Sequence, residues 1–373
     1  MTEDLAGAYR PSHDELARQQ FVGALKQYVN GPLEQAIAAD YAARIQPEHR
    51  QRSGRDPVNR HDVAEAFSRS RLFQLWGAAV YESQDMMWRT VDETVQRVLP
   101  DFAAAYAKLG ATRLGSLELD PSLVLPEPIR DVEIHRQPGG YFAEADGSDL
   151  LTALRYFGTV ELYRNAKGMD PGNRAGEPGI GSFIVGQVKK RYPEIAPARI
   201  VDLGCGPGID TIAYARAFPE ADLWGIDLSP PFLRFAHLWA ETQGHSIHYR
   251  QANAAATGLE EASVDLIVSN ILFHETSDEV LRGILRETRR ILAPGGVMLN
   301  FDVAYQPDRI SVPRQVTNAW QVVNNGEPYW TGFAELDLRA ELLEAGFPAE
   351  SIRYEYEPLG SNELLVFGAE VPA

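Results

Sequence analysis

Short runs rich in β-branched and aromatic residues recur through the second half of the chain, and helical patterns separate them. The strand-like runs are "ARIVDL", "DLWGID", "HSIHYR", "VDLIVSN" and "GVMLNFD". The segments between them, such as "DTIAYARAF" and "EVLRGILRETRRIL", place apolar residues three and four positions apart. Strands that alternate with helices form a parallel sheet covered on both faces, with ligands at the carboxyl ends of the strands. We therefore predict a doubly wound α/β fold.

The two ends of the chain have other patterns. "SIRYEYEP" and "ELLVFGAE" predict a C-terminal antiparallel hairpin, which completes a mostly parallel seven-stranded sheet. From residue 11 to about residue 110 the periodicity is helical, and "VEIHRQPGGYF" at 132–142 predicts a short strand and a turn. We therefore divide the chain into a mostly helical N-terminal domain, residues 1–150, and an α/β domain, residues 151–373. The glycine- and proline-rich segment 167–182 is either a flexible linker or an ordered loop beside the ligand.

The stretch "VDLGCGPGID" follows the first strand of the α/β domain and opens its first helix. It contains three glycines, Gly204, Gly206 and Gly208. Ile209 stands where a dinucleotide-binding turn needs a third glycine or an alanine, so the turn is poorly suited to a pyrophosphate. Asp202 adds a negative charge that favours a ligand carrying an ammonium and a sulfonium. Asp227 ends the second strand, where a carboxylate can accept hydrogen bonds from both hydroxyls of a ribose. The pattern indicates a cationic adenosine compound without phosphate.

Four motifs, "VDLGCGPGID", "WGIDLSP", "VSNILFHE" and "LAPGGVMLNFD", resemble the successive motifs of the class I S-adenosylmethionine-dependent methyltransferases. The resemblance extends from about Ala198 to the C-terminus and implies that S-adenosyl-L-methionine is the cofactor and S-adenosyl-L-homocysteine the product. The residues that it implies for cofactor binding are Asp202, Gly204, Cys205, Gly206, Asp227, Leu228, Asn253 and Asn270. Asn253 stands where the family often has an acid that contacts the adenine amino group. Asn270 to Leu272 would lie beside the transferred methyl group.

The stretch that begins "NILFHE" is similar to O-methyltransferases of the caffeate type, in which a histidine after the fourth strand deprotonates the acceptor. This resemblance implies that His274 is the catalytic base and that Asp302, after the fifth strand, holds it. It also implies that the helical N-terminal domain forms a homodimer. The apolar faces of that domain, which the sheet does not need for its own core, predict either a roof over the pocket or such a dimer seam. A competing interpretation is that His274 caps the next helix or packs beneath it.

Other features have competing structural interpretations. The glycines could serve only a tight turn, Asn253 could be a turn residue, and Cys205 could be a small filler in the core. The segment 303–333 is rich in aromatic residues and could either close over an acceptor or form a surface excursion with a small core of its own.

Charge and composition limit the kinds of partner that we expect the protein to bind. The chain of 373 residues has a formal net charge of −17 and no evident basic patch, so we expect no binding to nucleic acid or to a membrane surface. A single cysteine fits a cytoplasmic protein, and we expect no metal site.

The prediction is a methyltransferase that acts on a small organic acceptor, with O-methylation favoured over N- or C-methylation. The alternatives are a protein methyltransferase acting on a basic polypeptide and a non-catalytic binding protein.

Overall fold

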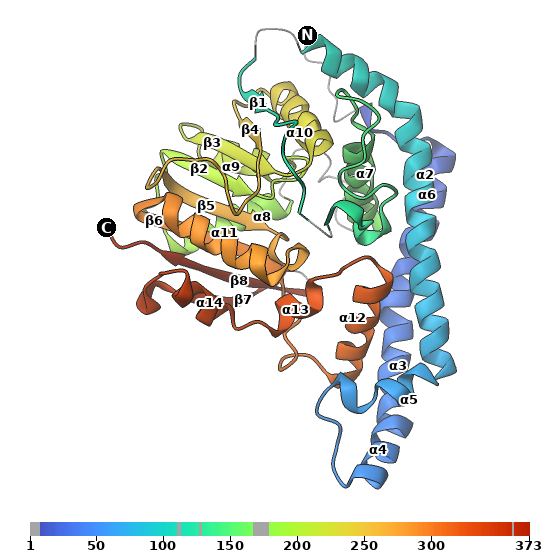
Figure 1. The fold of residues 1–373 in the computed structure, drawn as a ribbon. Coiled ribbons are helices and arrows are strands. Elements are labelled where there is room, and N and C mark those ends of the chain that lie inside the picture. The colour runs from blue at the N-terminus through green and yellow to red at the C-terminus, as the bar shows by residue number, and fades with distance from the viewer. Residues whose placement is uncertain (1–7, 110–112, 127–128, 167–178, 360–361) are drawn as a thin grey trace.

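The computed structural model describes residues 8–109, 113–126, 129–166, 179–359 and 362–373. An eight-stranded sheet with helices on both faces stands beside a layer of long N-terminal helices (Figure 1). The strands are β1 (Ser116–Glu118), β2 (Arg199–Leu203), β3 (Asp222–Asp227), β4 (His248–Gln251), β5 (Val264–Asn270), β6 (Leu292–Val303), β7 (Arg353–Leu359) and β8 (Asn362–Glu370). Their order is β1-β4-β3-β2-β5-β6-β8-β7, in which β1 to β6 are parallel and β8 runs antiparallel to both of its neighbours, β6 and β7.

The predicted doubly wound sheet and its C-terminal antiparallel hairpin are confirmed, with one strand more than expected. The additional strand, β1, pairs in parallel with β4 and comes from the N-terminal half of the sequence. The strand predicted within 132–142 is wrong. His135 and Arg136 have φ values of +52° and +58°, a left-handed conformation that a strand cannot contain, and the chain forms a helical turn at Ile134–Arg136 instead.

Helices cover the two faces of the sheet in two sets. The first set is α8 (Ile180–Arg191), α9 (Thr211–Ala217) and α10 (Pro230–Thr242), and the second is α11 (Asp278–Ile291), α13 (Trp330–Glu335) and α14 (Leu338–Glu344). Successive side chains of β2 alternate between the faces: Ile200 belongs to the core under the first set and Val201 to the core under the second. Both are fully buried, as expected for a central parallel strand.

The N-terminal layer consists of α2 (His13–Tyr28), α3 (Glu34–Asp40), α4 (Gln46–Ser53), α5 (Ala64–Ser68) and the 38-residue α6 (Arg71–Lys108). A later helix, α7 (Leu151–Ala166), packs against α2 and α6 and belongs to the same layer. Its apolar core continues into the α/β part. The ring of Phe235 on α10 lies 5.4 Å from that of Phe157 on α7 and 6.0 Å from that of Phe102 on α6. The helical layer therefore packs directly against a helix of the sheet.

The aromatic-rich segment 303–333 contains α12 (Val312–Asn324) and most of α13. In Figure 1, α12 lies beside the N-terminal helices. The Trp320 ring packs edge-on against that of Trp76 on α6 at 5.2 Å, and Gln315 Oε1 accepts a hydrogen bond from the backbone N–H of Arg60. The segment thus ties the end of the sheet to the helical layer.

The division at residue 150 stays a prediction, although β1 places some earlier residues within the sheet. Most of the segment predicted as a linker or ordered loop, residues 167–178, lies outside the described residues. Among the helices that are described, none is both long and apolar enough to span a membrane.

Candidate active site

The turn between β2 and α9 depends on its glycines. Gly204, Gly206 and Gly208 have φ values of +66°, +52° and +73°, where a residue with a Cβ is strained. A Cβ on Gly204 would also lie 2.7 Å from Leu272 Cδ1, and one on Gly208 would lie 2.8 Å from Ala236 Cβ. The sequence therefore forms a tight turn that passes close to two neighbouring elements.

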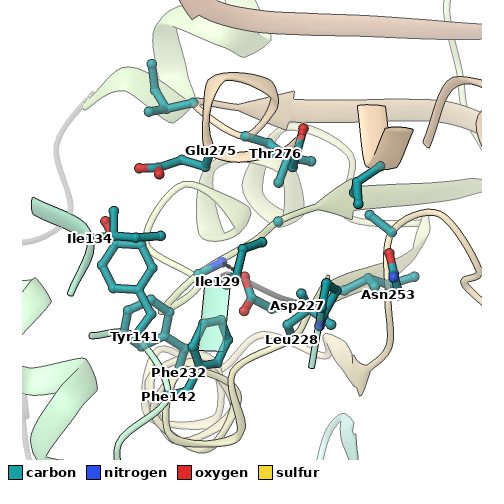
Figure 2. Close-up of a pocket in the computed structure, with 18 of the residues that line it drawn as sticks. Ile129, Ile134, Tyr141, Phe142, Asp227, Leu228, Phe232, Asn253, Glu275 and Thr276 are labelled. Carbon is teal, nitrogen blue, oxygen red and sulfur yellow. Dashed lines mark hydrogen bonds between the residues drawn. The ribbon is translucent and has the colours of Figure 1, made fainter. Parts of the chain in front are cut away.

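A cavity lies at the carboxyl ends of β2 to β5. Its empty volume is about 940 Å³, counted with the solvent at its mouth. On the sheet side it is lined by Gly204, Gly206, Asp227, Leu228, Asn253 and Asn270. Its other walls are lined by apolar and aromatic residues, among them Ile129, Ile134, Tyr141, Phe142 and Phe232. Figure 2 shows Tyr141, Phe142 and Phe232 grouped near Asp227, with Ile134 beside Tyr141. The cavity therefore has a polar end on the sheet and an apolar wall supplied mainly by earlier parts of the chain.

Asp227 holds the glycine turn while lining the cavity. Its Oδ2 accepts a hydrogen bond from the backbone N–H of Gly206 at 2.9 Å, and its Oδ1 accepts one from that of Ser229 at 2.8 Å. Burial raises the pKa of the carboxyl group, and these backbone hydrogen bonds oppose the rise. A carboxylate has about four lone-pair sites, so the backbone contacts leave capacity for a hydroxyl group of a ligand.

The two asparagines differ in what they leave free. Asn253 Oδ1 accepts a hydrogen bond from the backbone N–H of Ala255 at 2.9 Å, the contact of a turn residue. Asn270 Nδ2 donates to Asp210 Oδ2 at 2.9 Å, whereas Asn270 Oδ1 is buried without a hydrogen-bond partner. A buried carbonyl oxygen without a donor is costly, which points to a ligand donor at this position.

Ile271 directly follows Asn270 and also lines the cavity. Its φ is +58°, which is unusual for a β-branched residue and costs on the order of 1–3 kcal/mol. The backbone N–H of Ile271 donates to the carbonyl oxygen of Phe301 on β6 at 2.8 Å, and this contact helps to hold the strained turn. Nothing in the sequence pattern indicates this strain.

Asp202 and Cys205 lie beneath the cavity wall and do not line it. Asp202 is buried, and its Oδ2 accepts a hydrogen bond from the Thr211 hydroxyl at 2.6 Å. Burial raises the pKa of Asp202 to about 8. Burial also raises the pKa of the Cys205 thiol well above its usual value, which fits a small packed side chain. Direct contact of either side chain with a cofactor stays a prediction.

The structure brings His274 and Asp302 together. His274 Nδ1 donates to Asp302 Oδ1 at 2.6 Å, and Asp302 Oδ2 accepts from the backbone N–H of Phe273 at 2.8 Å. Burial alone would lower the pKa of His274, but the Asp302 carboxylate outweighs it and raises the pKa to about 9. The ring is 1% exposed, does not line the cavity, and its Nε2 lies 3.6 Å from Glu275 Oε1. The role of His274 as a base stays a prediction.

Glu275 and His135, which sequence reasoning did not single out, line the cavity where His274 does not. His135 Nε2 lies 3.3 Å from Glu275 Oε1, and His135 Nδ1 lies 2.5 Å from Oε1 of the buried Glu327. Burial by itself lowers the pKa of His135, but Glu327 and Glu275 outweigh it and raise that pKa well above its usual value. These three residues lie far apart in the sequence, so no spacing could have revealed them.

Comparisons with known proteins agree with this geometry. A family model described as a methyltransferase domain matches residues 200–296. The trans-aconitate 2-methyltransferase of Methylobacterium radiotolerans is 33% identical over 123 residues, which are 33% of this chain and 43% of that protein. The demethylmenaquinone methyltransferase of Thermus thermophilus is 34% identical over 110 residues, 29% of this chain and 49% of that protein. This chain thus spans less than half of the length of either relative.

Among solved structures, a Haemonchus contortus phosphoethanolamine N-methyltransferase in complex with S-adenosylhomocysteine is similar with a TM-score of 0.40. It is 17% identical, and the match covers 50% of this chain and 52% of that one. The matched family segment runs from the second residue of β2 past the end of β5, and it includes the glycine turn, Asp227 and Asn270. Residues 200–296 therefore match a methyltransferase domain, and the relatives that are similar over this part of the chain are methyltransferases.

Proposed function

We propose that this protein transfers a methyl group from S-adenosylmethionine to a small organic acceptor, with an oxygen atom as the favoured methyl acceptor. One observation carries the proposal: residues of the cofactor motifs and apolar side chains from the segment 129–142 line a single cavity. A methyl donor on the sheet side and an acceptor against the opposite wall would then share one enclosed space. The wall supplied by Ile134, Tyr141 and Phe142 favours a compact, partly apolar acceptor over a polypeptide.

The residues on the sheet side fit the cofactor. Asp227 offers free lone pairs for ribose hydroxyls, and the left-handed glycines keep the turn open where a Cβ would narrow it. The unpartnered Oδ1 of Asn270 can accept a hydrogen bond from the ammonium of the methionine part. When bound, S-adenosylmethionine supplies an electrophilic methyl group on a sulfonium. The chain's own contribution is to bind and orient the two partners and to exclude water.

Removal of the acceptor proton would involve the group formed by Glu275, His274 and Asp302. Since Glu275 lines the cavity and His274 does not, a proton that leaves an acceptor hydroxyl would pass to the Glu275 carboxylate and from there to His274 Nε2. The ring accepts it only in its neutral form, which is populated above the pKa of about 9. Asp302 fixes the orientation of the imidazole through Nδ1. This arrangement keeps the predicted roles of His274 and Asp302 and adds Glu275 between the base and the acceptor.

The test is to incubate the full-length protein with S-adenosylmethionine and a panel of small hydroxyl, amine and carbon acceptors, and to measure S-adenosylhomocysteine. We expect acceptor-dependent product with at least one hydroxyl compound. His274→Ala should then lower kcat about 10²- to 10⁴-fold while the affinity for S-adenosylhomocysteine stays unchanged. Turnover of only carbon or amine acceptors would overturn the choice of oxygen. Wild-type kcat in His274→Ala would reject the base and leave methyl transfer standing.

The remaining parts of the function are proposals as well. We propose cytoplasmic action and a homodimer formed through the helical layer. A molar mass of one chain in solution, measured by light scattering, would reject the dimer.

A further inference from the structure

Three ionisable side chains from distant parts of the chain meet at the edge of the cavity. His135 comes from the turn that precedes α7, Glu275 from the turn after β5, and Glu327 from the connection between α12 and α13. One potential ligand atom of each lies within 4.8 Å of those of the other two. His135 and Glu275 line the cavity, whereas the Glu327 side chain is fully buried behind them.

The fold holds His135 in place at an energetic cost. Its φ of +52° lies in the left-handed region, which costs an ordinary residue roughly 1–2 kcal/mol. Two side chains of α6 fix this conformation, since Gln84 Nε2 and Trp88 Nε1 each donate to the His135 carbonyl oxygen at 2.8 Å. The helical layer therefore positions an imidazole against the methyltransferase domain, which a mere space-filling residue would not require.

The two glutamates have unused ligand atoms. Oε2 of Glu275 and Oε2 of Glu327 are both buried without a hydrogen-bond partner. Within the described residues, Glu275 and Glu327 form ion pairs only with the histidines His135 and His274. Together with Asp302, three carboxylates face two imidazoles, so the group carries at least one excess negative charge even when both rings are protonated. Such an excess in a buried place favours a bound cation.

We propose that His135, Glu275 and Glu327 bind a divalent first-row transition-metal ion, of the Mn²⁺, Fe²⁺ or Co²⁺ type. Atoms that bind such an ion at about 2.1 Å lie about 3 Å apart when adjacent in an octahedron and about 4.2 Å when opposite. His135 faces Glu327 through Nδ1 at 2.5 Å and Glu275 through Nε2 at 3.3 Å, so an ion would take one ring nitrogen and the glutamate on the other side would have to turn towards it. One ligand atom of each residue already lies within 4.8 Å of those of the other two. One imidazole nitrogen with two carboxylates is a borderline-to-hard ligand set, which suits these ions better than a thiolate site would.

The place of this site suggests its use, and this part rests on the proposed function. The ion would lie beside the cavity, with coordination positions left for oxygen atoms of the acceptor. A bound cation lowers the pKa of a hydroxyl that it contacts and orients it, which would favour an acceptor with two neighbouring oxygens. This proposal replaces the expectation of no metal site, which rested on the single cysteine and did not consider histidine and glutamate.

The experiment uses the full-length, tag-free protein after chelator treatment. It is titrated with Co²⁺ while visible absorption is recorded, and with Mn²⁺ and Mg²⁺ in a calorimeter. We expect one Co²⁺ or Mn²⁺ per chain and much weaker binding of Mg²⁺. Glu327→Gln should weaken Mn²⁺ binding at least tenfold, since even indirect partners of metal ligands contribute about 10- to 100-fold. His135→Asn removes the imidazole with a residue that tolerates left-handed backbone, and it should have a similar effect.

Glu82→Gln is the matched control, because Glu82 is an exposed residue of α6 paired with Arg89. It should bind Mn²⁺ as the wild type does. Binding of S-adenosylhomocysteine to Glu327→Gln would show that the variant is folded. Because metal binding is measured without methyl transfer, a failure of the metal proposal can be told apart from a failure of the proposed function. The proposal would be overturned if the wild type bound neither Co²⁺ nor Mn²⁺, or if both Glu327→Gln and His135→Asn bound Mn²⁺ as tightly as the wild type does. His135 would then be an internal ionic bridge between two carboxylates.

Discussion

Replacing Asp227 by alanine should weaken cofactor binding while leaving a folded protein. Both carboxylate oxygens already accept backbone hydrogen bonds, from Gly206 at 2.9 Å and from Ser229 at 2.8 Å, and the remaining lone pairs are available to the ribose. Loss of the charge-assisted contact to the ligand is worth about 1.5–3 kcal/mol, which is a tenfold to hundredfold loss of affinity. The two orphaned N–H groups should lower the free energy of unfolding by about 1–3 kcal/mol more.

The assay is calorimetric titration with S-adenosylhomocysteine, together with circular dichroism to establish folding. Asp227→Asn retains one carbonyl oxygen and should give an intermediate affinity. Asp222→Ala serves as the control, because Asp222 lies at the opposite end of the same strand, where it pairs with Arg199. A folded Asp227→Ala protein with wild-type affinity would refute the assignment of the ribose contact.

Three further outcomes are expected. Gly204→Ala should reduce S-adenosylhomocysteine binding more than Gly206→Ala, because both have positive φ but only the Cβ at Gly204 would meet Leu272, at 2.7 Å; equal affinities by calorimetry would contradict this. Burial lowers the pKa of Lys26 to about 8, so the unfolded chain retains more protons above that pH. The free energy of unfolding of the wild type minus that of Lys26→Met should therefore rise between pH 8 and 10, by at most about 1.4 kcal/mol per pH unit. A difference that does not change with pH, measured by urea titration, would contradict this. Trp320 is half-buried, so Trp320→Ala should destabilise the protein by about 1.5–3 kcal/mol if its contact with Trp76 holds α12, and a loss below about 0.5 kcal/mol would not fit.

The parts of the site that follow a local pattern could be predicted from the sequence. A turn that leaves a buried strand and enters a helix needs residues that accept positive φ, so the glycines of 201–210 marked its place. Asp227 could be predicted because parallel strands end at one edge of the sheet. The contact between His274 and Asp302 was expected from a family resemblance, and their carboxylate–imidazole geometry is present.

Other parts depend on tertiary contacts that no local pattern encodes. β1 has only three residues, too few for a periodicity, and forms because β4 offers it a free edge. The left-handed conformation of His135 is held by Gln84 and Trp88, which lie more than forty positions earlier. The strand prediction at this place was wrong because no local pattern encodes these contacts. Glu327 lies in a connection whose path is set by packing of α12 on the helical layer. The cavity-lining role of His135 and Glu275 therefore needed the structure.

The central claim is that the cavity at the ends of β2 to β5 binds S-adenosylmethionine. It is tested most directly by titrating the full-length wild-type protein with S-adenosylhomocysteine and, separately, with NAD⁺. We expect saturable binding of S-adenosylhomocysteine at one site per chain and no detectable binding of NAD⁺, because Asp227 and the glycine turn suit a ribose without a pyrophosphate. Tight binding of NAD⁺, or no binding of S-adenosylhomocysteine by a folded protein, would contradict it.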